Sequence, residues 1–324
     1  MENPAGPGRS SGIGCYLLAL GLIAAVSVGV NVADLRVGTA PAADETLARE
    51  MLKSPAVRVF LGALMLATLA GLVILATSTA GALRGIGSIP PPLIQPSALL
   101  IGFLVFLIAL FLLSGVAAAL VGVFGVDPET GRGAVRYVVV EIAAILCAFT
   151  LSFTVLSRVL SMTGEDIREM GWRCLGLGRT LVWGAGGYMA ALPLLFGGLW
   201  ISQGLFRNIE TPQHPIVDTL LRGGTAFWLA AVLAVVIAPI VEETCFRGML
   251  YGALRSQMGV WPASAVSAAF FAAMHPTLPA GFLPILALGV VLAVLRERTG
   301  SLVPSMVCHA INNAVALALV RLLY

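Results

Sequence analysis

Long runs of apolar residues alternate with short polar connections along most of the chain. A helix that crosses a bilayer needs about 20 apolar residues, and somewhat fewer suffice where it lines a polar cavity. By this measure the sequence predicts spanning helices at residues 15–32, 57–76, 98–124, 137–160, 181–201, 226–250, 263–275, 282–295 and 302–323. The predicted fold class is therefore all-α, a polytopic membrane bundle of about eight or nine transmembrane helices.

Prolines, glycines and charged residues mark the connections between these runs. The connections are residues 34–54, 87–96, 127–136, 163–179 and 206–222, and none is long enough to fold as a soluble domain. The run at residues 15–32 can also be read as a signal peptide, but it is longer than the usual apolar core of one, so a retained anchor is favoured. We divide the chain into residues 1–220, membrane helices without an assigned role, and residues 221–324.

Composition supports a membrane location. Hydrophobic residues make up 59% of the chain and charged residues 11%, which leaves too little polar surface to cover a soluble protein of 324 residues. With a net charge of +3 and Lys53 as the only lysine, the chain has no basic stripe for a nucleic acid, so the bilayer is the expected partner. Richness in arginine, alanine and glycine indicates a bacterial inner membrane, and the basic residues favour an inside N-terminus only slightly. No pattern sets the oligomeric state.

Ionisable side chains interrupt three of the last apolar runs. Glu242 and Glu243 end the run that starts at Ala226, His275 ends the next, and His309 lies inside the last one. Counted at about 1.5 Å per residue from the nearest break, these side chains lie roughly 12 to 20 Å deep. Such groups within a membrane usually have a function, because each needs a partner or water. The sequence therefore predicts that three helices direct them at one cavity.

The spacing within each run suggests how the work is divided. Glu243 and Arg247 are neighbours at i and i+4, which leaves Glu242 pointing elsewhere without a local cation. A desolvated carboxylate near a histidine can act as a general base on water. His309 and Asn313 share one helical face, so both can present donors to an oxygen that becomes negative.

Together these residues form three motifs, EExxxR at residues 242–247, FxxxH at Phe271–His275 and HxxxN at His309–Asn313. In this order, and on apolar helices, they resemble those of the CAAX-protease and bacteriocin-processing (CPBP or Abi) family of intramembrane proteases. The resemblance extends over residues 226–320. No part of the first 220 residues contributes to it beyond their being membrane helices.

This resemblance implies an intramembrane endopeptidase, similar to CAAX prenyl protease 2 and usually classed as a metalloendopeptidase, which cuts membrane-associated proteins or peptides. Glu242 and His275 would activate water, His309 and Asn313 would stabilise the oxyanion, and Glu243 with Arg247 would hold the helix in register. Glu242, His275 and His309 can also form the shell of a divalent metal, with zinc the first choice. The same residues can work without a metal.

Two other classes of protein are weighed against this one. A non-catalytic scaffold or bacteriocin-immunity protein of the same fold would be expected to lack Glu242 or a histidine, and all are present. A transporter would be expected to show internal repeats, and the halves are not similar. The sequence has no HExxH, no GxSxG and no aspartate within a predicted span, which excludes other intramembrane protease types. Glu141, near the start of the fourth run, is interpreted as an interfacial residue.

Overall fold

The computed structural model describes residues 54–82, 90–125, 130–207, 209 and 223–323. The described part is helical, as predicted. Its helices are α3 (Pro55–Ala82), α4 (Pro96–Val123), α5 (Gly131–Thr154), α6 (Gly164–Glu169), α7 (Leu177–Leu205), α9 (Gly224–Val232), α10 (Ala238–Glu243), α11 (Tyr251–Arg255), α12 (Val260–Ala273), α13 (Phe282–Thr299) and α14 (Val303–Leu323). Three π-helical segments, η2 (Val155–Val159), η3 (Leu233–Ile237) and η4 (Thr244–Leu250), adjoin α5 and α10.

Six stretches of the described chain are long and apolar enough to cross a membrane. They are residues 55–76, 96–123, 131–159, 177–205, 224–255 and 303–322, and α12 is a shorter apolar helix. Every predicted run from residue 57 onward is helical, whereas the predicted run at residues 15–32 lies outside the described residues. The protein is therefore a polytopic membrane helix bundle.

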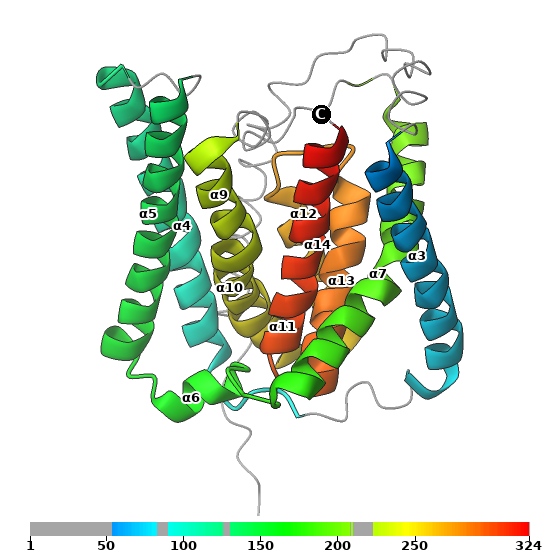
Figure 1. Ribbon diagram of the computed structural model, residues 1–324. Helices are drawn as coiled ribbons and strands as arrows, with labels where there is room; N and C mark the ends of the chain where they lie inside the picture. The colour runs from blue at the N-terminus through cyan, green and yellow to red at the C-terminus, as the bar shows by residue number, and fades with distance from the viewer. Residues whose placement is uncertain (1–53, 83–89, 126–129, 208, 210–222, 324) are drawn as a thin grey trace, which may run out of the picture.

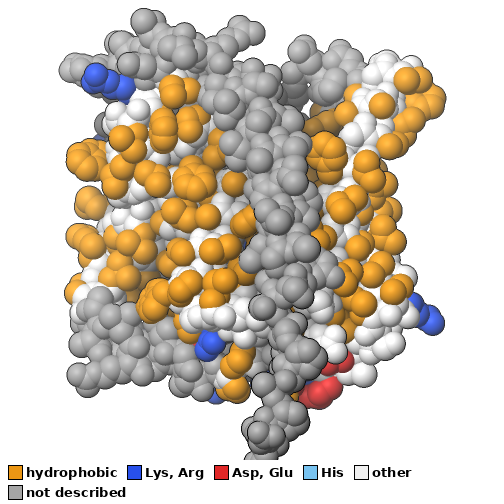
Figure 2. Space-filling model, turned by 180° about the vertical axis from the view of Figure 1, so that it is seen from behind, with side chains coloured by type: hydrophobic (Ala, Val, Ile, Leu, Met, Phe, Trp, Pro, Cys, Tyr) orange, Lys and Arg blue, Asp and Glu red, His pale blue; other side chains and the backbone are white. Residues whose placement is uncertain are grey.

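Large apolar side chains face outward along these helices. Phe111 on α4, Val182 on α7 and Trp200 on α7 are more than 60% exposed. Figure 2 shows such side chains covering the middle of the molecule, with the visible charged groups toward its two ends. This distribution suits helices that have a hydrocarbon solvent around them, because lipid tails solvate apolar side chains that water would not.

The bundle has two outer helix pairs and a central group (Figure 1). Helices α4 and α5 pack together at one side, and α3 packs on α7 at the other. Helices α9 to α14 lie between them, with α12 on α13 and with α13 and α14 against α7. The largest apolar core joins α4 to η4 and α12 through side chains such as Phe103, Met249 and Phe271. The residues of all three motifs belong to this central group.

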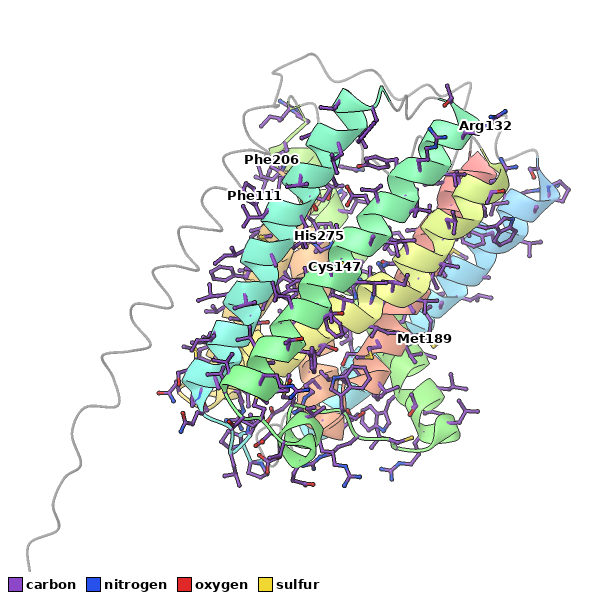
Figure 3. All side chains as sticks on the ribbon, turned by 90° about the vertical axis from the view of Figure 1, so that its left-hand side faces the viewer. Phe111, Arg132, Cys147, Met189, Phe206 and His275 are labelled. Carbon is purple, nitrogen blue, oxygen red and sulfur yellow. The ribbon has the colours of Figure 1, made fainter. Side chains whose placement is uncertain are left out.

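A close approach of two backbones fixes α3 on α7. Pro193 lies inside α7 and has no N–H, so the carbonyl of Met189 four residues earlier has lost its usual helical donor. Gly71 of α3 faces that carbonyl so closely that a Cβ would overlap its oxygen. Only glycine allows this contact between the helices. Met189 is labelled on α7 in Figure 3.

The fourth run begins earlier than the sequence suggested. Helix α5 starts at Gly131, where the hydroxyl of Thr130 accepts a hydrogen bond from the amide of Gly133. Glu141 is therefore ten residues into the helix, about 15 Å from its start. The N-cap adds almost two turns of helix before the apolar run, so Glu141 lies further from the start of its helix than the sequence suggested.

The connection at residues 163–179 contains the short helix α6. Its capping box pairs Thr163 with Asp166, and the hydrogen bonds from the Thr163 amide and hydroxyl lower the pKa of the Asp166 carboxyl. The buried guanidinium of Arg296 donates to the carbonyls of Glu169 and Met170, and Leu302 donates to that of Gly171. The turn after α6 is thereby attached to the turn between α13 and α14.

Candidate active site

Two π-helical segments, η3 and η4, enclose α10, the turn that carries the two glutamates. The cause of the first is visible in the sequence, because Pro239 has no N–H to donate. The amide of Ala238 bonds to the carbonyl of Leu233, five residues earlier, and in that register Pro239 would have to serve the carbonyl of Ala234. The side-chain amide of Asn313 donates to Ala234 instead, at 2.8 Å. Asn313 thus joins α14 to the π-helical segment before the glutamates.

Glu243 and Arg247 form the predicted i, i+4 contact, with both side chains fully buried. Nη1 of Arg247 donates to Oε1 of Glu243 at 2.9 Å, and Nη2 donates to the backbone carbonyl of Gly289 on α13 at 3.1 Å. A Cβ on Gly289 would lie 2.8 Å from that of Ala268 and 3.2 Å from Nη2. Glycine is needed here because α12, α13 and the guanidinium meet at this point.

Glu243 also contacts His309, 66 residues later in the chain. Nδ1 of His309 lies 3.1 Å from the same Oε1, and the imidazole is almost fully buried. A carboxylate paired with arginine can only accept, so Nδ1 is the nitrogen that carries the hydrogen and donates. Glu243 therefore orients the imidazole and directs the other nitrogen, Nε2, toward Glu242.

Glu242 is the more accessible of the two acids, with a side chain 29% exposed against 0% for Glu243. Its Oε2 lies 3.8 Å from Nε2 of His309, too far for a hydrogen bond. This oxygen is itself buried and has no hydrogen-bond partner in the described part of the chain. Two polar atoms at this separation can share a bridging water, which would satisfy the oxygen.

Phe271, the first residue of the FxxxH motif, contacts both histidines. Its ring meets the ring of His275 edge-on with centroids 4.5 Å apart, and that of His309 with centroids 5.6 Å apart. The guanidinium of Arg247 lies over the same ring at 4.3 Å. Nδ1 of His275 is 2.7 Å from the carbonyl of Phe271, which can only accept, so the ring of His275 is fixed as a donor there. One phenyl ring therefore separates and orients the two imidazoles.

The three motifs thus meet around one group of side chains. The structure brings Glu242, Glu243, Arg247, Phe271 and His309 together, and His275 joins them through Phe271. Figure 3 places His275 at mid-height of the bundle, close to the level of Cys147 in the middle of α5. Asn313 lies one turn beyond His309, but its amide already donates to Ala234. An asparagine amide has a second hydrogen, which leaves one donor for an oxyanion.

Replacing Phe271 by leucine tests this arrangement of the rings. Edge-on aromatic contacts contribute about 0.5–1.5 kcal/mol each, and a buried cation–π contact up to about 2 kcal/mol. Phe271→Leu keeps an apolar side chain but removes all three contacts. For the peptide cleavage that the resemblance to the CAAX-protease family implies, we therefore expect kcat to fall at least tenfold with little change in KM. The pH profile of kcat should also shift, because the imidazoles lose their fixed positions.

Phe103→Leu is the matched control. Phe103 is also fully buried, and its ring contacts Phe246, with centroids 5.2 Å apart. It should lower the melting temperature, though less than Phe271→Leu because it removes a single ring contact, and leave kcat unchanged. If the two variants lose equal activity, Phe271 acts through general packing alone.

The metal shell inferred from the sequence does not assemble in this arrangement. Within the described ranges, no three His, Cys, Asp or Glu side chains converge closely enough to hold one ion. In both histidines Nδ1 donates to an acceptor, which leaves Nε2 as the nitrogen that could bind a metal. The spacing of Glu242, His275 and His309 does not fit a common ion, so no chemical step is derived through a metal.

Comparison with known families agrees with the motifs. Residues 224–315 match the family model described as type II CAAX prenyl endopeptidase Rce1-like. These residues form an Rce1-like domain. The matched segment lies within the predicted unit 221–324 and contains every motif residue, so the resemblance to the CAAX-protease family is confirmed. No curated protein and no solved structure is significantly similar to the chain. The Rce1-like domain and the apolar helices together support a CAAX-protease-like peptidase that is integral to the membrane.

Proposed function

We propose that the protein is an intramembrane endopeptidase in which Glu242 activates the water that cuts a peptide bond. The observation that carries this proposal is the unpartnered, buried Oε2 of Glu242, facing Nε2 of His309 at 3.8 Å. A water bonded to both atoms is oriented and can lose a proton to the carboxylate. The Rce1-like match to residues 224–315 supports peptide hydrolysis as the reaction.

The proposed reaction has two proton transfers. Glu242 takes one proton of the water, and the oxygen of that water attacks the carbonyl carbon of the peptide. The tetrahedral intermediate then expels the amine as the C–N bond breaks, and the proton held by Glu242 passes to that nitrogen. The second hydrogen of the Asn313 amide is the proposed donor to the negative oxygen, since Asn313 adjoins this group of residues. Nδ1 of His275 already donates to the carbonyl of Phe271, so this ring can donate to the oxygen through Nε2 only when it is protonated.

Glu243 and Arg247 are positioning residues in this scheme. Glu243 holds His309 by Nδ1, as the carboxylate does in other catalytic pairs of acid and histidine, while Arg247 neutralises Glu243 where both side chains are fully buried. The substrate is proposed to be a membrane-associated protein or peptide, because the site lies on helices that cross the bilayer. Location in a bacterial inner membrane stays a prediction.

Removal of metal tests whether the residues act alone. We expect purified protein, treated with a strong chelator and shown by elemental analysis to hold less than about one zinc per ten chains, to keep its rate of peptide cleavage. The reason is that Glu242 and His309 already provide a base and an acceptor for water. Loss of activity that returns on adding Zn²⁺ alone would contradict this and would make zinc part of the site.

A further inference from the structure

Glu141 is an acidic side chain within the membrane that the proposed reaction does not use. The span that contains it, residues 131–159, has 29 residues and is about 43 Å long. A hydrocarbon layer about 30 Å thick, centred on this span, leaves about 6 or 7 Å outside at each end. At about 15 Å from the start of α5, Glu141 is then roughly 8 Å inside the hydrocarbon. A carboxylate at such a depth is expensive and usually functional.

The position of Glu141 on α5 directs it inward. It lies between Val138 and Ile145 on one helical face, at the i, i+3 and i+7 spacing. Both neighbours pack into the core cluster that joins α5 to Ala230 and Leu233 and to Leu317 of α14. Glu141 itself is only partly buried and makes no hydrogen bond or ion pair with the described residues. Among the described residues, the electrostatic neighbour of Glu141 is the phenol of Tyr137, which supplies no positive charge.

Glu141 shares its depth with polar groups on the two adjacent helices. Helices α5 and α9 begin, and α14 ends, at the same side of the bundle (Figure 1). Ala234, whose carbonyl accepts from Asn313, is ten residues after the start of α9, and Asn313 is ten residues before the end of α14. Helix α5 contacts α9, and η3 contacts α14. Counted along their helices, Glu141 and the Asn313–Ala234 pair are therefore each about 15 Å from this side, and we call this level the polar layer.

This layer is close to the proposed catalytic residues. Glu242 follows Ala234 by eight residues in the chain, and eight residues of helix are about 12 Å long. An extended peptide advances about 3.3 Å per residue, so the same interval corresponds to three or four residues of substrate. A substrate that runs from Glu242 along α9 toward this side of the bundle would bring a side chain of that position to the level of Glu141, on the helix packed against α9.

We propose that Glu141 is a recognition site for a basic side chain, lysine or arginine, located three or four residues from the bond that is cut. This inference rests on the proposed peptidase function. A carboxylate in a medium of low dielectric constant attracts a cation strongly, and none of the described residues supplies one to Glu141. The long apolar stems of lysine and arginine also suit the alkyl side chains around it, since the stem packs while the charge reaches the carboxylate.

The test uses peptides in detergent micelles that carry lysine, arginine, glutamine or glutamate at one position at a time, with the cut sites identified by mass spectrometry. Wild-type protein should cut the basic peptides at least tenfold faster than the glutamine ones when the residue is three or four positions from the bond. Glu141→Gln should remove this preference and leave the rate for glutamine peptides unchanged, and Glu141→Lys should favour glutamate peptides. Glu165→Gln, an exposed acid on α6, is the matched control and should keep the wild-type preference.

A binding measurement separates failure of this inference from failure of the proposed function. In the Glu242→Gln background, fluorescence anisotropy should show tighter binding of the lysine peptide than of the glutamine peptide, and adding Glu141→Gln should abolish the difference. If wild type cuts no peptide while this difference persists, the peptidase function fails and the cation site stands. If cleavage or binding shows no preference for basic residues, or keeps it in Glu141→Gln, the recognition site is overturned.

Discussion

Glu242→Gln is expected to reduce peptide cleavage at least about a hundredfold while the protein stays folded. The amide keeps the shape of the side chain but cannot take a proton from water, and general-base catalysis contributes about 10²–10⁴-fold. The loss of fold should be negligible, because Oε2 has no hydrogen-bond partner among the described residues that the substitution would break. Removal of a partly buried charge can even raise the free energy of unfolding. Single-turnover cleavage and the melting temperature in the same detergent measure the two effects.

The companion variant is Glu243→Gln, which changes the adjacent carboxyl and leaves Glu242 intact. Glu243 orients His309 and pairs with Arg247, so its loss should lower both the melting temperature and kcat. A stable but inactive Glu242→Gln would identify Glu242 as the general base, and a less stable Glu243→Gln would identify Glu243 as the residue that supports the site. If purified Glu242→Gln cuts peptides at the wild-type rate, Glu242 is not the base, and a non-catalytic scaffold that co-purifies with a protease becomes the better account.

The helical fold could be predicted because each spanning helix is determined by the apolar residues of its own segment. A run of about 20 apolar residues has no stable alternative to a helix in a bilayer, where every backbone donor must be satisfied within the segment. The contact between Glu243 and Arg247 follows equally from a spacing of four residues. Both inferences use only the geometry of a single helix, so neither needs the tertiary arrangement.

The contact between Glu243 and His309 could not be predicted in the same way. It joins residues 66 positions apart, and it depends on how α10, α12 and α14 cross. The sequence paired Glu242 with His275 in the activation of water, and it gave no sign that Nε2 of His309 lies 3.8 Å from Glu242. Motif order indicates that residues share a site, but it does not say which atoms face one another.

Asn313 illustrates a signal that was present in the sequence but not used. Pro239 lies within an otherwise apolar run, and a proline there must leave a carbonyl without its donor. A polar side chain from another helix is then required in the membrane, where water is scarce. The amide of Asn313 supplies it. Thr130 is a similar signal, since a threonine before the glycine-rich turn can cap a helix and extend it ahead of the apolar run.

Arg247→Ala is expected to destabilise the fold strongly. The guanidinium is fully buried and holds three groups at once, the carboxylate of Glu243, the carbonyl of Gly289 and the ring of Phe271. Removing one partner of a buried ion pair leaves an uncompensated charge and costs about 3–5 kcal/mol. We expect a fall of many degrees in the melting temperature, a lower yield from the membrane and loss of peptide cleavage.

Two further variants separate the charge of Arg247 from its packing. Arg168→Ala removes an exposed arginine that pairs with Glu165 at 3.7 Å, with both side chains about 70% exposed, so its effect should be at most about 1 kcal/mol. The double variant Glu243→Gln with Arg247→Met removes both charges, so it should recover part of the stability lost in Arg247→Ala but none of the activity, because His309 loses its carboxylate. If Arg247→Ala melts at the wild-type temperature and only cleavage falls, Arg247 acts directly on the substrate, and the support assigned to the Glu243–Arg247 pair is wrong.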